Sequence, residues 1–167
     1  RVRLLVSRRG DVRCEATPRE SLPTGFGDVV LAREPVNAGD LFLYHKTTRR
    51  RVYEDARRMC PGSDDVLLFN EAGEITESTT ANVSVEIEGV LCTPPVRCGL
   101  LPGTQRAWLL DHARMRERVI SIQEALSSPN IFLLNSVRGM QKVRVRVPEE
   151  RKTPNPASEA TARERPG

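Results

Sequence analysis

Alternating apolar and polar residues begin the chain and predict a β-hairpin. Apolar side chains recur at every second position in residues 1–7 and again in residues 12–17. The intervening Arg8-Arg9-Gly10-Asp11 has the glycine expected of a tight turn. A connector with proline and glycine covers residues 18–27, and the apolar run at residues 29–33 predicts a third strand.

The apolar spacing then changes to a helical period. Val52, Ala56 and Met59 fall on one stripe of a helix expected over residues 48–59, with Thr47 or Thr48 available as its N-cap. Pro61-Gly62 is expected to end this helix, and the apolar residues 41–44 before it are interpreted as a buried strand.

A meander of short strands follows, with helices near its end. Strands are expected at residues 65–69, 75–77, 82–87, 90–93, 118–122, 131–134 and 139–147, and helices at residues 103–114 and 123–126. Residues 148–167 have almost no bulky apolar side chain, so this tail is predicted to be disordered. The pattern favours an α+β (mixed α/β) domain built on a mixed sheet or open barrel with flanking helices.

Composition and charge narrow the classes of function. Hydrophobic residues make up 38% of the 167 residues and charged residues 29%, which is compatible with a folded core. The net charge of +4 is concentrated in residues 1–58, which suits an anionic ligand or an ordinary solvated basic surface. Nucleic-acid binding is not expected, because no aromatic residues are interleaved with Arg49, Arg50 and Arg51.

Membrane and metal chemistry are not expected either. No run of about 18 apolar residues is present, and no leader of the signal-peptide type begins the chain. The four cysteines are scattered without a Cys-x-x-Cys pair, so we expect reduced, mostly buried thiols in a cytoplasmic protein and no metal site.

Lys46 and Glu77 are candidates for chemistry. If Lys46 emerges from a buried strand, desolvation disfavours its ammonium form, and its neutral amine could form an imine with an aldehyde. An ordinary surface lysine is the alternative. Glu77, at a strand end, could keep a pyridine nitrogen protonated, or it could simply face solvent.

Two polar turns are candidates for binding an anion. Gly103-Thr104 leads into the expected helix 103–114, where free backbone N–H groups and a hydroxyl could face the anion. Simple capping by Thr104 is the alternative. Asn135-Ser136 ends an apolar strand and could offer a hydroxyl to the same anion.

Four segments in this order resemble one enzyme family. They are His45-Lys46-Thr47-Thr48-Arg49-Arg50 with a later tyrosine, then I-T-E-S-T-x-A-N from residue 75, G-L-L-P-G-T-x-R from residue 99 and N-S-V-R-G from residue 135. The series resembles the class IV aminotransferases, which are pyridoxal 5′-phosphate (PLP) enzymes of fold type IV. Within them it is most similar to aminodeoxychorismate lyases and to the lyase-like domains fused to aminodeoxychorismate synthase.

The resemblance implies a domain arrangement. Residues 28–147 would form the PLP-binding large domain and residues 1–17 a remaining hairpin of the small N-terminal domain, which would otherwise be largely missing. Residues 18–27 would be the connector and residues 148–167 the tail.

The resemblance also implies roles for individual residues. Lys46 would hold PLP as a Schiff base and carry the proton, Glu77 would contact the ring nitrogen, and Leu101 would pack on the ring. Asn82 would support the loop behind Glu77. The phosphate would be held at the Gly103-Thr104 turn by the backbone N–H groups of Thr104 and Gln105, together with Ser136 and the amide of Val137. Gln105 stands where many relatives have a second hydroxyl residue.

The activity implied is that of a PLP-dependent lyase converting 4-amino-4-deoxychorismate to 4-aminobenzoate and pyruvate. A transaminase of branched-chain or D-amino acids is the nearest alternative, and a truncated domain without catalysis is another. The expected partners are a small amino substrate and a second copy in a homodimer, or a larger fused enzyme.

Overall fold

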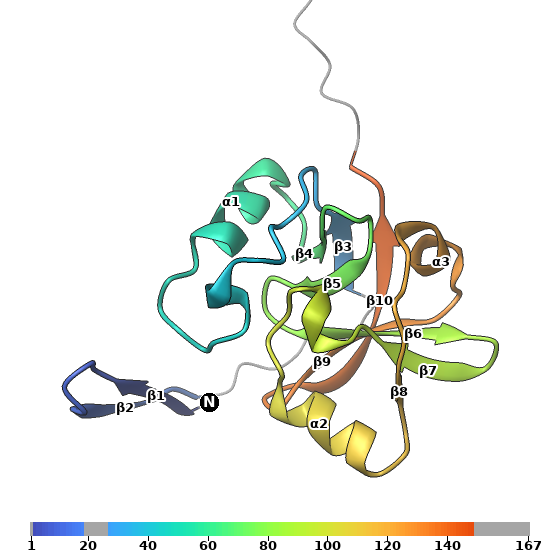
Figure 1. The fold of residues 1–167 in the computed structure, drawn as a ribbon. Coiled ribbons are helices and arrows are strands. Elements are labelled where there is room, and N and C mark those ends of the chain that lie inside the picture. Colours follow the sequence, from blue (N-terminus) through green and yellow to red (C-terminus); the bar gives the residue numbers. More distant parts are fainter. Residues whose placement is uncertain (1, 19–26, 149–167) are drawn as a thin grey trace, which may run out of the picture.

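The computed structural model describes residues 2–18 and 27–148. Its main body is an eight-stranded mixed sheet whose strands run in the order β5-β4-β3-β10-β9-β6-β7-β8 (Figure 1). The strands are β3 (Gly27–Leu31), β4 (Asp65–Phe69), β5 (Ile75–Ser78), β6 (Asn82–Ile87), β7 (Val90–Thr93), β8 (Arg116–Glu117), β9 (Ile131–Asn135) and β10 (Gly139–Arg146).

The sheet closes on itself. Strand β5, at one edge of the order, also pairs with β6 through Glu77 opposite Asn82, so six strands form a ring from which β7 and β8 branch. β3 runs parallel to β4 and β10, and the remaining ring pairs are antiparallel. The expected mixed α+β fold with a barrel-like sheet is therefore confirmed.

Three apolar clusters hold this arrangement. All six ring strands contribute to the largest cluster, with members such as Val29, Leu67 and Val83, and Ala125 of α3 (Ile122–Ser127) packs into it. Helix α1 (Arg51–Met59) covers the other face of β3 and β4 through the second cluster. Helix α2 (Thr104–Asp111) packs on β9 through the third. The region where β5 meets β6 therefore lies between two helices.

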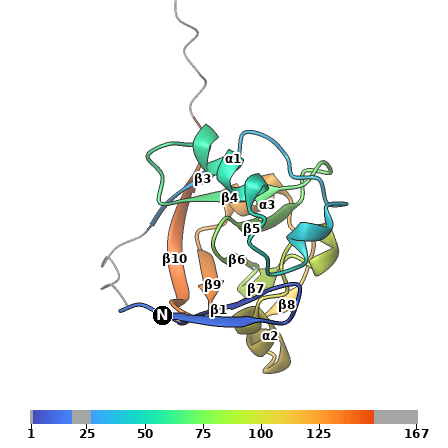
Figure 2. The same cartoon turned by 90° about the vertical axis from the view of Figure 1, so that its left-hand side faces the viewer.

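The expected N-terminal hairpin forms a separate two-stranded sheet of β1 (Val2–Val6) and β2 (Val12–Ala16) (Figure 2). The register places six small or apolar residues on one face, because directly opposed residues in an antiparallel pair share a face. These residues are Val2, Leu4, Val6, Val12, Cys14 and Ala16, and all are exposed.

Three expectations about secondary structure were wrong. Residues 41–44 do not form a buried strand: Leu41–Leu43 is a short 3-10 helix in which Leu43 is buried but Leu41 is 70% exposed. Helix α1 begins at Arg51, three residues late, and neither Thr47 nor Thr48 caps it, because its N-cap is Arg50 without a side-chain cap bond.

The third wrong expectation is the strand at residues 118–122. A capping box between Ser121 and Glu124 starts α3 at Ile122, so local hydrogen bonding ends any strand before that point. Within the connector and the tail, residues 19–26 and 149–167 lie outside the described residues, so the prediction of a disordered tail stays a prediction.

Candidate active site

Glu77 occupies the point where the barrel closes. It lies in β5 opposite Asn82, the first residue of β6, and is only 5% exposed, so it is not a solvent-facing carboxylate. The Tyr53 hydroxyl of α1 donates to Glu77 Oε1 at 2.8 Å, and Asn82 Nδ2 donates to Oε2 at 3.2 Å. Both carboxylate oxygens are therefore held from different elements.

The surroundings of Glu77 have opposing effects on the pKa of its carboxyl. Burial raises the pKa of Glu77 from its ordinary 4.5 to about 7, while hydrogen bonds from Tyr53 and the Leu101 backbone and the charges of Lys46 and Arg50 act to lower it. Burial, and then the charge of Glu77, raises the pKa of Tyr53 well above 10, so its hydroxyl stays a donor. Glu77 can consequently gain or lose a proton near neutral pH.

Asn82 connects Glu77 to the segment before α2. Its Nδ2 also donates to the carbonyl of Leu101 at 2.8 Å. A Cβ atom on Gly103 would lie 2.2 Å from Asn82 Oδ1, so only glycine fits there without moving Asn82. The half-buried Leu101 is thereby fixed beside the carboxylate.

The two polar turns meet beyond that segment. Thr104 Oγ1 and Ser136 Oγ are 2.6 Å apart, and both residues are exposed. Thr104 does not cap α2, because the N-cap is Gly103 and no side chain bonds the first-turn amides there. The amides of Thr104 and Gln105 stand at the positive end of the helix dipole, next to two hydroxyls.

Val137 fits its predicted role less well. Its N–H donates to Asn135 Oδ1 at 3.1 Å, and the same oxygen accepts the N–H of Arg138 at 2.8 Å. This amide is thus engaged within its own turn, whereas the Ser136 hydroxyl faces Thr104.

Lys46 lies in the loop between the 3-10 helix and α1 and is exposed. The expectation that it emerges from a buried strand was wrong, so burial within this chain does not desolvate its amine. Its charge nevertheless acts on Glu77, which places the lysine and the carboxylate within electrostatic reach of each other.

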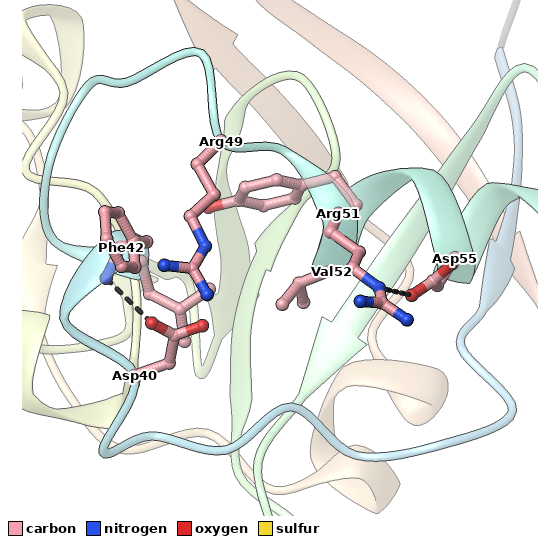
Figure 3. Close-up of a pocket in the computed structure, with 8 residues that line it drawn as sticks. Asp40, Phe42, Arg49, Arg51, Val52 and Asp55 are labelled. Carbon is pink, nitrogen blue, oxygen red and sulfur yellow. Dashed lines mark hydrogen bonds and ion pairs between the residues drawn. The ribbon is translucent and has the colours of Figure 1, made fainter.

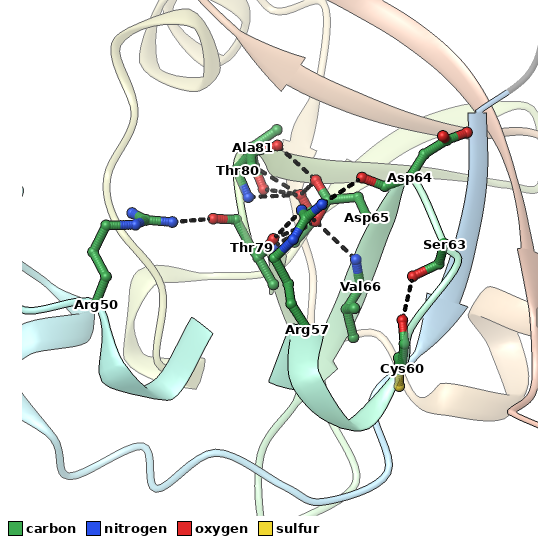
Figure 4. A network of polar contacts seen from close by, with 11 residues as sticks. Arg50, Arg57, Cys60, Ser63, Asp64, Asp65, Val66, Thr79, Thr80 and Ala81 are labelled. Carbon is green, nitrogen blue, oxygen red and sulfur yellow. Dashed lines mark hydrogen bonds and ion pairs between the residues drawn. The ribbon is translucent and has the colours of Figure 1, made fainter. Parts of the chain in front are cut away.

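A buried polar network braces the loop after Glu77 (Figure 4). The Asp65 carboxylate accepts hydrogen bonds from the hydroxyls of Ser78, Thr79 and Thr80, and Arg57 forms an ion pair with it at 3.5 Å. Sequence reasoning missed this network. A charged residue beginning an apolar strand, followed by a cluster of hydroxyl residues, was the available signal.

Tyr53 was also missed as part of the site. Helical spacing placed Val52 on the buried stripe of α1, but the more deeply buried residue is Tyr53, at 9% exposure. The Arg50 guanidinium lies over the Tyr53 ring at 4.6 Å. The tyrosine in the first motif was the signal for this contact.

The pocket in Figure 3, of about 250 Å³, lies on a neighbouring surface. Tyr53, Arg49 and Phe42 are among its lining residues, but Lys46 and Glu77 are not. The Arg49 guanidinium lies 4.1 Å from the centre of the Phe42 ring.

Metal sites and membrane-spanning helices are absent from residues 2–18 and 27–148. No group of three or more His, Cys, Asp or Glu side chains there could hold a metal ion. No helix in those ranges is long and apolar enough to cross a membrane. Cys60, Cys92 and Cys98 are buried and Cys14 is exposed, all as free thiols.

Comparison with known proteins shows the family of the chain. The model of the family described as "Amino-transferase class IV" matches residues 1–145. The chain belongs to the amino-transferase class IV family. A solved structure from Mesorhizobium loti named "Putative amino-acid aminotransferase" is similar to this class IV chain at 40% identity and a TM-score of 0.82, covering 87% of this chain and 72% of that one.

Two yeast proteins are similar to the class IV chain in sequence. "Putative aminodeoxychorismate lyase" of Schizosaccharomyces pombe is 30% identical, over 85% of this chain and 65% of that protein. Aminodeoxychorismate lyase of Saccharomyces cerevisiae is also 30% identical, over 85% of this chain and 50% of that protein. The chain therefore spans about half to two thirds of the length of these curated relatives.

Proposed function

We propose that this chain is the PLP-binding part of a class IV lyase that converts 4-amino-4-deoxychorismate to 4-aminobenzoate and pyruvate. The observation that carries the cofactor assignment is the buried Glu77, held by Tyr53 and Asn82. The lyase assignment rests on the names of the two yeast relatives.

The donor set fits PLP at both ends of the molecule. A buried carboxylate with a pKa near 7 is suited to accept a hydrogen bond from a protonated ring nitrogen, because the positive ring would stabilise its ionised form. The Thr104–Ser136 hydroxyl pair and the first-turn amides of α2 offer donors to a phosphate dianion. Val137 would need to release Asn135 to donate there.

PLP supplies an electron sink for the bond broken at the substrate carbon. Lys46 would hold the cofactor covalently and move a proton at that carbon. Glu77 would keep the ring nitrogen protonated, Leu101 would pack against the ring, and Thr104, Gln105 and Ser136 would hold the phosphate.

A second function is favoured by one comparison. The Mesorhizobium loti structure, at 40% identity, is named an aminotransferase. The same residues would hold the cofactor for amino transfer, and Lys46 would again move the proton. We therefore keep a class IV transaminase as the alternative.

We also propose a domain and assembly arrangement. The exposed apolar face of the hairpin supports the assignment of residues 1–17 to a small N-terminal domain beside the PLP-binding residues 28–147. A homodimer, a larger fused enzyme and a cytoplasmic location remain predictions.

The cofactor assignment is tested by reconstitution with PLP followed by borohydride reduction. We expect an imine absorption band and, after reduction, a peptide carrying the cofactor on Lys46. Lys46→Ala should abolish the labelling, and Lys142→Ala, which changes another exposed lysine, should leave it intact. Absence of bound PLP in the unmutated chain would favour the domain without catalysis.

Lyase and transaminase are separated by their products. The reconstituted chain is offered 4-amino-4-deoxychorismate and, separately, amino acids with 2-oxo acids. Formation of 4-aminobenzoate and pyruvate without amino transfer supports the lyase, and conversion of the cofactor to its amine form by ordinary amino acids supports the transaminase.

A further inference from the structure

Among the described residues, Tyr53 is the one side chain of α1 that forms a hydrogen bond with the Glu77 carboxylate. Its ring packs in the second apolar cluster, and its hydroxyl donates a hydrogen bond to Glu77 Oε1 at 2.8 Å. A buried hydroxyl whose pKa lies well above 10 cannot act as a base at neutral pH, so donation to the carboxylate is its available chemistry.

The tyrosine is itself held in place. The Arg50 guanidinium lies over its ring, and Arg50 Nη2 donates to the carbonyl of Thr79. Thr79 belongs to the loop braced by Asp65, whose carboxylate accepts both its N–H and its hydroxyl (Figure 4). A continuous series of contacts therefore runs from the Asp65 network through Arg50 to Tyr53.

The two side chains that donate to Glu77 come from different elements. Asn82 holds Oε2 from β6, and Tyr53 holds Oε1 from α1. The two carboxylate oxygens offer four acceptor positions. Tyr53, Asn82 and the Leu101 backbone use three of them, so these bonds fix the plane of the group and leave one position for a further donor.

We propose that Tyr53 is a positioning residue that orients the Glu77 carboxylate toward the ring nitrogen of the bound cofactor and keeps it ionised. The inference rests on the proposed function, since it assigns Glu77 to that nitrogen. Lys46 and Arg50 also face Glu77 with their charges, from the loop before α1, and Asn82 and the Leu101 backbone face it as neutral donors.

The chain offers a matched control, because Tyr44 and Tyr53 are its two tyrosines. Tyr44 donates to the carbonyl of Ala38 at 2.6 Å and has no assigned bond to Glu77. Tyr53→Phe and Tyr44→Phe therefore each remove one hydroxyl donor, but only the first removes it from the carboxylate.

The first measurement uses the chain without cofactor. A ¹³C chemical-shift titration of the glutamate carboxyls, with Glu77→Gln to assign the signal, gives the midpoint of Glu77. We expect Tyr53→Phe to raise this midpoint by about one pH unit, because a hydrogen bond to a charged group is lost, and Tyr44→Phe to leave it unchanged. An unchanged midpoint in Tyr53→Phe overturns the inference.

A second measurement does not depend on the folding of a variant. In the unmutated chain, the ring Cζ signal of Tyr53 should change with the same midpoint as the Glu77 carboxyl, and the Tyr44 signal should not. A Tyr53 signal that is insensitive to the titration of Glu77 contradicts the contact.

The role toward the cofactor is measured by PLP affinity at two pH values. We expect Tyr53→Phe to bind PLP about fivefold more weakly than Tyr44→Phe at pH 7. The gap should close at a pH above the raised midpoint, where Glu77 is ionised in both variants. A loss that does not change with pH indicates a structural role and rejects the inference, whereas failure of the unmutated chain to bind PLP on Lys46 rejects the proposed function itself.

Discussion

Replacing Glu77 by glutamine should change how the stability of the cofactor-free chain depends on pH. Burial raises the pKa of this carboxyl from 4.5 to about 7 in the folded state. The folded chain therefore holds the proton more tightly than the unfolded chain between these values. Its stabilising contribution is fully present below pH 4.5 and is lost as the pH rises through 7.

The size of the loss follows from the shift. Each pKa unit corresponds to about 1.4 kcal/mol, so the shift of Glu77 represents a loss of about 3 kcal/mol across this range. Glutamine does not titrate, and any cost of fitting its amide beside Asn82 is independent of pH. The unfolding free energy of the unmutated chain minus that of Glu77→Gln should therefore fall by about 3 kcal/mol from pH 4.5 to pH 8.

Urea unfolding followed by circular dichroism at several pH values provides the measurement. Glu74→Gln is a matched control of opposite sign, because a hydrogen bond from Asn70 lowers the pKa of Glu74. Glu74 therefore contributes stability that is present above pH 4.5 and lost as the pH falls further. A difference in unfolding free energy between the unmutated chain and Glu77→Gln that stays constant with pH, or grows as the pH rises, would refute the claim that burial raises the pKa of Glu77.

Three further substitutions test the surroundings of the site. Gly103→Ala places a Cβ 2.2 Å from the side-chain oxygen of Asn82 and should cost about 1–3 kcal/mol in urea unfolding. Gly27→Ala, whose Cβ meets its nearest neighbour at 3.5 Å, should cost less. Asp65→Asn removes the charged acceptor of the buried network and should cost about 3 kcal/mol, with an unchanged melting temperature counting against that network. Thr104→Val should weaken PLP binding about tenfold in an absorbance titration, and equal affinity would exclude its hydroxyl as a phosphate donor.

The sequence predicts most strands of this fold and a barrel-like sheet, but not the strand pair that closes it. Alternation and turn residues placed the hairpin and the strands around residues 65–93, because these signals are local. The pairing of Glu77 with Asn82 joins β5 to β6 across a short turn, and nothing in the alternation shows that this same pairing closes a ring. Apolar residues at 41–44 gave a false strand, since only Leu43 among them is buried.

The candidate site was predicted only in part, because local motifs do not report contacts between distant segments. Motif order identified Glu77, Thr104 and Ser136, and the fold brings the last two within 2.6 Å of each other. Tyr53 and Asp65 were missed because their roles depend on contacts with distant strands and loops. A helical period reports which face of α1 is buried but not which polar group its tyrosine meets.

The closing pair of the barrel links the chemistry of the chain to its local dynamics. Glu77 opposite Asn82 is the single residue pair in the register of β5 with β6, whereas β6 is joined to β9 by four. Such a short ladder is the natural place for transient opening, since few backbone hydrogen bonds must break there. A cofactor held by Glu77 and by the start of α2 would suppress this opening. Cofactor binding would then be detected as slower amide hydrogen exchange along β5 and β6.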